Sequence, residues 1–456
     1  MSLTDEDVAE AVELFRDLLR IDTTNPPGDE RPAAELLADY LADAGFDPWI
    51  VESEVDRANL VVRLPATVDE PTGGPLMLAG HTDVVPADAS EWTQPPFEAV
   101  RADGCIWGRG AVDMKNMVAM SAVVTALLRR RETERERDLI FAAVADEEEG
   151  CEHGSAFLVD EHPDRVRADY VLGEVGGFWQ YVGGVLYVPV MVAEKGRAHL
   201  RLTARGPSGH ASLPRSDAAT VELARAIERL GRRRLPYHST PPVRRFVEAL
   251  AEAQPFASPT RAGLAGLRSP LLAETVIDRL LPDPEVARNF DALLHNTVAP
   301  TRLEAGGALN VLPSEAVCDL DGRMLPGFSG DDLRGEVEAC LEGLAVDVEV
   351  VDEQPGVCAE EIDGPLFDTI RSAVSEHRTE AHPVPYMIPG YTDARHFSRL
   401  GATCYGFAPL AIPEETDIAF SEMFHGVDER VPVEGFEWGL RVLYDVVSTF
   451  LDPATS

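Results

Sequence analysis

Three short apolar runs, each followed at once by acidic residues or a histidine, constrain the fold of this chain most strongly. Leu76–Gly80 leads into His81-Thr82-Asp83, Leu139–Ala145 leads into the acidic run 146–149, and Tyr170–Gly173 leads into Glu174. Runs this short and apolar are typical of strands buried on both faces of a parallel sheet. Because open α/β sheets bind ligands at the carboxyl ends of their strands, we expect these polar residues to meet at one edge.

Helical patterns, such as Met114–Arg130, alternate with these strands, which predicts an α/β fold with helices on both faces of a mostly parallel sheet. From about residue 190 the pattern changes. Ala198–Ala204 and Ala316–Arg323 alternate between apolar and polar residues, as strands with one solvated face do. Buried-strand and helix patterns resume after Gly356. The sequence therefore predicts a larger domain in two parts, 1–192 and 357–456, with an α+β domain inserted at 193–356.

The chain is strongly acidic, with 79 Asp and Glu against 40 Lys and Arg in 456 residues, a net charge of -39. Such a surface repels phosphate backbones and anionic lipid, so it disfavours nucleic-acid and membrane partners. The acids are spread along the chain rather than blocked, which favours a solvated surface adapted to high salt over an acidic binding tail. Only Lys115 and Lys195 are lysines; the other 38 basic residues are arginines.

No secretory signal and no run of 18 apolar residues is visible in the sequence. The six cysteines are scattered without a CxxC pair, which favours reduced thiols and predicts a cytoplasmic protein.

The residue types at the strand ends predict a metal site. His81 could bind a metal through one ring nitrogen, with Asp83 orienting the ring. Imidazole with carboxylate suits zinc, or a neighbouring metal such as cobalt or manganese. Taken singly, His81 could be a hydrogen-bonded core histidine, and residues 146–149 could be a solvated helix start. Together they favour a metal, because several carboxylates after buried strands are costly without a cation.

A glycine-containing segment, residues 108–115, adds another acid. Gly108 and Gly110 suggest a dinucleotide-binding loop, but Asp113 occupies the place of its third glycine and would face a phosphate. We therefore expect a tight turn that aims Asp113 inward before a helix. The sequence contains no GxSxG elbow and no P-loop, which leaves serine-hydrolase and nucleotide-hydrolase chemistry without their key features.

The order of these motifs resembles one zinc metallopeptidase family, that of aminoacylase, carboxypeptidase G, acetylornithine deacetylase and succinyl-diaminopimelate desuccinylase. The motifs that carry the resemblance are His81-Thr82-Asp83, Gly110–Lys115, Asp146-Glu147-Glu148, Glu174, Gly206–Ser212 and His425-Gly426. The stretch Pro236–Pro313 is most similar to the branch of carboxypeptidase S and the N-acyl-amino-acid hydrolases. The resemblance covers nearly the whole chain.

The resemblance implies a two-zinc site in the catalytic domain. One zinc would be held by His81 and Glu174, and the other by Glu148 and His425. Asp113 would bridge the two ions, and in family structures the peptide bond that corresponds to Asp113–Met114 is cis. Asp83 would orient His81, and Glu147 would be the general base. Substrate would be bound by His210, Asn310, Arg323, Thr392 and Asp393.

The inserted domain would then serve as a lid and dimerisation domain, and in the family its histidine, here His210, often acts in the partner subunit. Each assignment has a simpler alternative: an interface histidine for His210, a turn cap for Asn310, and a strand-face ion pair for Arg323. Likewise, the apolar residues of Tyr237–Pro300 could be ordinary helix packing or a wall that receives an acyl chain.

The function implied is hydrolysis of an amide bond in a small N-acyl-amino acid or short peptide, by a homodimer. A biosynthetic deacylase, of the acetylornithine or succinyl-diaminopimelate type, is the alternative enzyme. A non-catalytic metal-binding module is a third hypothesis, although it would have no need of Glu147 beside Glu148.

Overall fold

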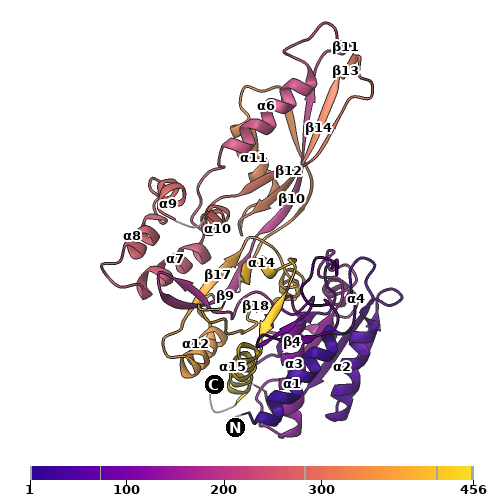
Figure 1. Ribbon diagram of the computed structural model, residues 1–456, viewed down its shortest axis with the longest axis vertical. Coiled ribbons are helices and arrows are strands. Elements are labelled where there is room, and N and C mark those ends of the chain that lie inside the picture. Colours follow the sequence, from indigo (N-terminus) through magenta and orange to yellow (C-terminus); the bar gives the residue numbers. More distant parts are fainter. Residues whose placement is uncertain (1–2, 72, 282–283, 417–419, 453–456) are drawn as a thin grey trace. The chain divides into compact units, whose positions relative to one another are not determined.

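The computed structural model describes residues 3–71, 73–281, 284–416 and 420–452. The chain divides into two compact units (Figure 1). The first comprises residues 1–192, 359–386 and 392–456, and the second comprises residues 193–358 and 387–391. The boundary falls within two strands, β9 (Val185–Glu194) and β17 (His382–Ile388).

The first unit is built on most of a large sheet with the strand order β1-β2-β6-β3-β7-β18-β9-β16, to which β8 and β17 are added beside β9; the last strand of this order, β16, belongs to the second unit. Its remaining strands are β1 (Trp49–Glu52), β2 (Ala58–Leu64), β3 (Leu76–His81), β6 (Leu139–Val144), β7 (Tyr170–Gly173), β8 (Gln180–Val182), β16 (Val357–Cys358) and β18 (Thr403–Gly406). The four central strands, β6, β3, β7 and β18, are parallel, and antiparallel pairs flank them. All residues of β3 and β6 are buried, so both faces of the sheet are covered. The predicted fold class is confirmed.

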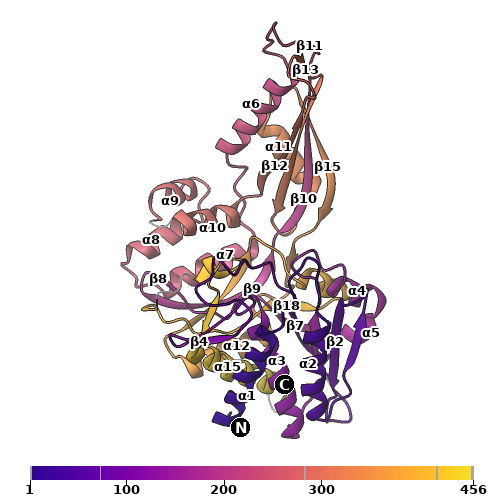
Figure 2. The same cartoon turned by 45° about the vertical axis from the view of Figure 1, so that its right-hand side comes forward.

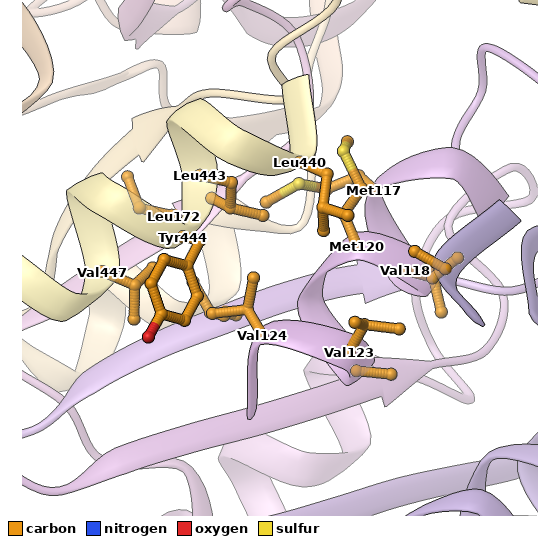
Figure 3. Packing of buried hydrophobic residues seen from close by; sticks show 14 of the residues in the cluster. Met117, Val118, Met120, Val123, Val124, Leu172, Leu440, Leu443, Tyr444 and Val447 are labelled. Atoms are coloured by element: carbon orange, nitrogen blue, oxygen red, sulfur yellow. The ribbon is translucent and has the colours of Figure 1, made fainter. Parts of the chain in front are cut away.

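The central helix of this unit is α3 (Lys115–Arg130), which contacts β3, β6 and helices α1 (Asp5–Leu19) and α15 (Val433–Leu451). Figure 3 shows Met117, Met120 and Val124 of α3 facing Leu440 and Leu443 of α15. Truncating one of these buried side chains to alanine would cost about 2–5 kcal/mol. The other helices of the unit are α2 (Arg31–Asp43), α4 (Ser155–Glu161), α5 (Pro163–Val166), α12 (Pro365–His377), α13 (Ala394–Phe397), the 3-10 helix η1 (Ser398–Leu400) and α14 (Phe420–Met423). A small sheet has the order β19 (Arg430–Pro432), β5 (Cys105–Trp107), β4 (Val100–Ala102).

The second unit contains a four-stranded antiparallel sheet, β12-β14-β10-β15, with α6 and α11 packed on one face (Figure 2). The bounds are β10 (Gly196–Arg205), β12 (Thr297–Ala305), β14 (Glu315–Met324), β15 (Val346–Gln354), α6 (Ala219–Arg232) and α11 (Gly330–Cys340). Burial alternates along β10 and β14, as the sequence predicted, because one face packs on the helices and the other is solvated. A separate two-stranded ribbon pairs β11 (Gly209–His210) with β13 (Val311–Leu312).

Four further helices of the second unit are α7 (Pro241–Ala253), α8 (Pro259–Gly266), α9 (Ala273–Arg279) and α10 (Pro284–Leu294). Their apolar residues divide into two sets. Phe246, Leu264, Leu267 and Ile277 are buried, as ordinary helix packing requires, whereas Leu271, Leu272 and Leu280 are exposed.

Both lysines are buried, and the ammonium group of each lies at the carboxyl end of a helix to which the lysine does not belong. Lys115 Nζ donates to the carbonyl oxygens of Leu18 (3.2 Å) and Ile21 (2.7 Å), at the end of α1. Lys195 Nζ donates to the carbonyl oxygens of Ala292 (2.9 Å) and His295 (2.8 Å), at the end of α10. A compact ammonium group can satisfy several orphan carbonyls at a helix end and complements the helix dipole there.

None of the six cysteines, all of which lie in the described part of the chain, forms a disulfide bond. Among the described residues, no helix combines the length and the apolar character needed to cross a membrane.

Candidate metal centre

The strand ends of the first unit bring the predicted ligands together. In the parallel register His81, the last residue of β3, pairs with Val144, the last residue of β6, so the acidic run begins beside the histidine. Glu174 follows β7, which pairs with β3 on its other side. The expectation that these polar residues meet at one edge of the sheet is confirmed.

Five side chains form two groups that share Asp113. In the first group, His81 Nε2 lies 3.1 Å from Asp113 Oδ1 and 3.7 Å from Glu174 Oε2. In the second group, His425 Nε2 lies 3.4 Å from Asp113 Oδ2 and 3.0 Å from Glu148 Oε2. Within each group the candidate ligand atoms all lie within 4.8 Å of one another. Asp113 thus presents one carboxylate oxygen to each group.

The charges of this cluster favour a cation. Burial and the neighbouring acids raise the pKa of Glu147 well above its usual value, and burial raises that of Glu174 to about 7. Hydrogen bonds to Asp113 and Glu148 raise the pKa of His425 to about 10. Glu174 Oε1 is buried and has no hydrogen-bond partner among the described residues. A buried carboxylate oxygen without a donor, in a set of imidazole and carboxylate groups, fits a site for divalent metals.

Asp83 holds the loop that follows β6. Its Oδ1 accepts from the backbone N–H of Glu147 and its Oδ2 from that of Glu148, both at 3.1 Å. Oδ2 also accepts from Asn25 Nδ2 at 2.9 Å. Nδ1 of His81 lies 3.0 Å from the backbone oxygen of Asp83 and 3.4 Å from its carboxylate. Asp83 therefore contacts both His81 and the loop that carries Glu147 and Glu148.

The turn that carries Asp113 is fixed by a glutamate that sequence reasoning missed. Gly110 has a φ of +84° and the bond from Asp113 to Met114 is cis, which agrees with the turn and the cis bond that we expected. Glu429, which is fully buried, accepts from the backbone N–H groups of Gly110 (2.9 Å), Val112 (2.5 Å) and Asp113 (3.0 Å).

Arg109 completes this arrangement. Its Nη1 donates to Glu429 Oε2 at 2.8 Å, and its Nη2 donates to the carbonyl oxygen of Gly426 at 2.7 Å. The ion pair thus links the Asp113 turn to the loop of His425, which lies more than 300 residues away in sequence. No local pattern in the sequence marks either partner.

A second buried network, also missed, supports the other side of the cluster. Arg57 pairs with Glu30 (2.9 Å) and with Asp146 (2.7 Å), and Asn25 donates to Asp146 at 3.0 Å. Asp146 has a φ of +67° and begins the loop that carries Glu147. Its role in the structure is to anchor this loop.

Thr392 and Asp393 are buried in the first unit. Asp393 accepts a hydrogen bond from Ser155 Oγ, and Thr392 Oγ1 accepts from the N–H of Ala394 at 3.1 Å. Arg395, in the same loop, donates to the carbonyl oxygen of Gly150 at 3.0 Å. The loop is therefore bound to the segment that follows Glu147 and Glu148.

The other three predicted substrate residues belong to the second unit. His210 is exposed in the two-stranded ribbon, where Nδ1 lies 2.7 Å from Ser212 Oγ, and Asn310 is exposed and accepts the N–H of Ala211 through its backbone oxygen. Arg323 forms a two-bond ion pair with Asp321 (2.7 and 3.0 Å) and lies over the ring of Tyr391. This is the strand-face ion pair that we considered as the alternative for Arg323.

Comparisons with known proteins agree with the site. A model of Peptidase family M20/M25/M40 matches residues 77–449. The chain is 30% identical to an N-fatty-acyl-amino acid synthase/hydrolase of Danio rerio, covering 80% of this chain and 70% of that protein. It is 28% identical to a succinyl-diaminopimelate desuccinylase of Methylobacterium radiotolerans, covering 94% and 93%.

Among solved structures, an M20 family metallo-carboxypeptidase from Sulfolobus solfataricus matches with a TM-score of 0.68 and 16% identity, covering 98% of this chain and 99% of that one. The fold of that protein and the fold described above are therefore alike. The family that the motif order resembled is confirmed. The chain belongs to peptidase family M20/M25/M40 and is a hydrolase that acts on amide bonds.

Proposed function

We propose that this protein hydrolyses the amide bond of an N-acyl-amino acid or short peptide at a site that holds two zinc ions, with Glu147 as the general base. The observation that carries the proposal is Asp113, whose two carboxylate oxygens face two separate groups of candidate ligands. His81 and Glu174 would hold one metal, and Glu148 and His425 the other. Imidazole and carboxylate donors suit zinc.

Two divalent metals held by these two groups would polarise the scissile carbonyl group and lower the pKa of a bound water toward neutrality. The carboxylate of Glu147 accepts a proton from the attacking water and delivers it to the nitrogen of the leaving amine. Its burial and its raised pKa suit a group that must hold a proton between these two events.

Replacing Glu147 with glutamine tests this role. We expect loss of turnover by a factor of at least about 100, the contribution of a general base, while the metal content stays at the wild-type value. Undiminished turnover would refute the role, and loss of metal together with turnover would make Glu147 a ligand instead. Glu149, the next acid in the run, is exposed, and Glu149→Gln is the matched control that keeps activity.

The substrate class is proposed from the relatives. Similarity to the fatty-acyl-amino acid hydrolase supports a substrate with a long acyl chain on an amino acid. Similarity to the desuccinylase, which covers a larger share of the chain, supports the alternative of a biosynthetic deacylase. Rates on a long-chain N-acyl-amino acid, an N-acetyl-amino acid, N-succinyl-diaminopimelate and a dipeptide distinguish the two. A preference for the succinyl substrate would replace our first choice.

Substrate recognition would involve the second unit. Arg323 would exchange Asp321 for the substrate carboxylate, which an arginine binds through two parallel hydrogen bonds. His210 and Asn310 would donate to the oxyanion. Thr392 and Asp393 would also bind the substrate. Loss of His210 would lower kcat, and loss of Arg323 would raise KM.

We also propose a homodimer through the second unit, whose edge strand β12 is exposed along most of its length. Co-expressing two variants with impaired turnover, His210→Ala and Glu147→Gln, tests whether His210 acts in the partner subunit. Recovered activity in the mixed dimer would support action between subunits, whereas none would place His210 in its own subunit. A monomer in sedimentation would refute the dimer.

A further inference from the structure

The charge of the chain is not evenly distributed. Residues 229–281, which run from the end of α6 through α7, α8 and α9, contain nine arginines and four acidic residues, a net charge of +5. The whole chain carries -39, which leaves -44 for the remainder. We refer to residues 229–281 as the basic segment.

Most of these arginines are exposed to solvent: Arg232, Arg233, Arg234, Arg244, Arg245, Arg268 and Arg279. Several are paired, as Arg268 is with Glu248 at 2.7 Å. Arg233 and Arg279 form no salt bridge with any residue in the described part of the chain. Arg232 and Arg234 pair with Glu228 and Asp291, two acids outside the segment. The positive charge left without a salt bridge therefore includes that of Arg233 and Arg279.

The same segment exposes large apolar side chains where its helices end. Phe256, between α7 and α8, is 91% exposed, and Leu271, between α8 and α9, is 88% exposed. Leu272 beside it and Leu280 at the end of α9 are also exposed. Phe256 is the only aromatic residue among the exposed large hydrophobics of the described chain, and the guanidinium of Arg261 lies 5.7 Å from its ring centre. In both ribbon views α8 and α9 lie farther from the four-stranded sheet than α10 does (Figures 1 and 2).

Along this segment exposed apolar residues alternate in sequence with exposed arginines, some of which form no salt bridge, and this combination is suited to the boundary between water and a lipid bilayer. There, apolar side chains enter the acyl region while arginines bind headgroup phosphates, often by paired hydrogen bonds. Nucleic acid would use the arginines and leave Leu271, Leu272 and Leu280 in water. We propose that the basic segment docks this protein peripherally on a bilayer that contains anionic lipid.

The acidity of the whole chain does not oppose this docking at close range. The Debye length is about 8 Å at physiological salt and about 3 Å at 1 M salt, so at either ionic strength charges farther than this from the bilayer are largely screened. The acidic remainder is repelled where it approaches the bilayer, which orients the protein with the basic segment toward the lipid.

Co-sedimentation with vesicles tests the proposal. We expect the wild-type protein to bind vesicles of phosphatidylcholine mixed with phosphatidylglycerol more tightly than vesicles of phosphatidylcholine alone. Replacing Phe256 and Leu271 with serine should weaken binding to the mixed vesicles about tenfold or more, since each buried side chain contributes to partitioning. Replacing Arg233 and Arg279 with glutamate should weaken it by a similar factor and abolish the preference for the anionic lipid.

The controls are matched in exposure and charge. Val55→Ser removes an apolar side chain that is 82% exposed in the first unit, and Arg101→Glu reverses an exposed charge there; both should bind as the wild type does. The affected side chains of all variants are exposed, so unchanged thermal midpoints verify their folding. The proposal is overturned if the wild type does not bind mixed vesicles, or if the segment variants bind as tightly as the controls. It is also overturned if the Phe256 and Leu271 changes alter only the oligomeric mass, which would make the segment a contact between protein chains.

Discussion

Replacing Glu429 with alanine should damage the metal centre although Glu429 is not a candidate ligand. The change leaves the guanidinium of Arg109, which is buried, without its carboxylate at 2.8 Å. It also leaves three backbone N–H groups of the turn, those of Gly110, Val112 and Asp113, without their acceptor. Removing one partner of a buried ion pair costs about 3–5 kcal/mol, and orphaned donors add to the loss where water cannot reach them.

We therefore expect the free energy of unfolding of the metal-free protein to fall by about 3–5 kcal/mol, measured by urea denaturation with chelator present. Metal affinity, measured by competition with a chromophoric chelator, should fall by about 10- to 100-fold, because Asp113 loses the support of its turn. Glu434→Ala, which removes an exposed acid from the first turn of α15, is the control and should cost less than about 1 kcal/mol.

A double variant separates the charge from the turn. Changing both Arg109 and Glu429 to methionine leaves no buried charge without a partner. The double variant should therefore lose less free energy of unfolding than the two single variants lose in sum. The reasoning is refuted if the free energy of unfolding of Glu429→Ala lies within about 1 kcal/mol of the wild-type value and the variant binds metal with unchanged affinity.

Three further predictions concern the lysines and the metal. Burial lowers the pKa of Lys195 to about 7 from 10.5, so between these values the unfolded chain binds a proton that the native protein does not, and stability should rise with pH. In urea denaturation above pH 7, the free energy of unfolding of the wild type should rise by about 1.4 kcal/mol per pH unit relative to that of Lys195→Met. If the difference between the two free energies does not change with pH, Lys195 stays charged in the native protein. Chelation should lower the thermal midpoint by leaving the buried acids unpaired, and added zinc, but not an equal addition of sodium chloride, should restore it; an unchanged midpoint would contradict this. Because Lys115 and Lys195 are both buried, peptide mapping should find neither modified by an amine-directed acylating reagent until urea unfolds the chain.

Local patterns in the sequence allowed the central strands of the sheet, and the meeting of polar residues at their ends, to be predicted. Apolar runs bounded by polar residues placed β3, β6 and β7 within a residue or two of their observed ends. The parallel arrangement then placed His81 and Glu174 at the same edge. Gly110 indicated the turn that directs Asp113, since a residue without a Cβ is needed where the backbone has a positive φ.

The supporting residues could not be predicted, because each is a single residue paired with a distant segment. Glu429 reaches the Asp113 turn from just before β19, and Arg57 reaches Asp146 from just before β2. Neither belongs to a periodic pattern, and an acid or arginine alone does not indicate its partner. His425 lies in a loop with a φ of +60°, and only the motif order pointed to it. The whole-chain charge likewise concealed the basic segment, because a sum does not show how charge is distributed.

The metal content of Asp113→Ala compared with the wild type is the most direct test of the central claim, that one carboxylate joins two metal sites. After dialysis against zinc and removal of loose metal, elemental analysis should find two zinc ions per wild-type chain. The variant should retain fewer than one, because both groups of ligands lose a member. A variant that still holds two ions per chain, or a wild-type protein that never holds more than one, would contradict the account.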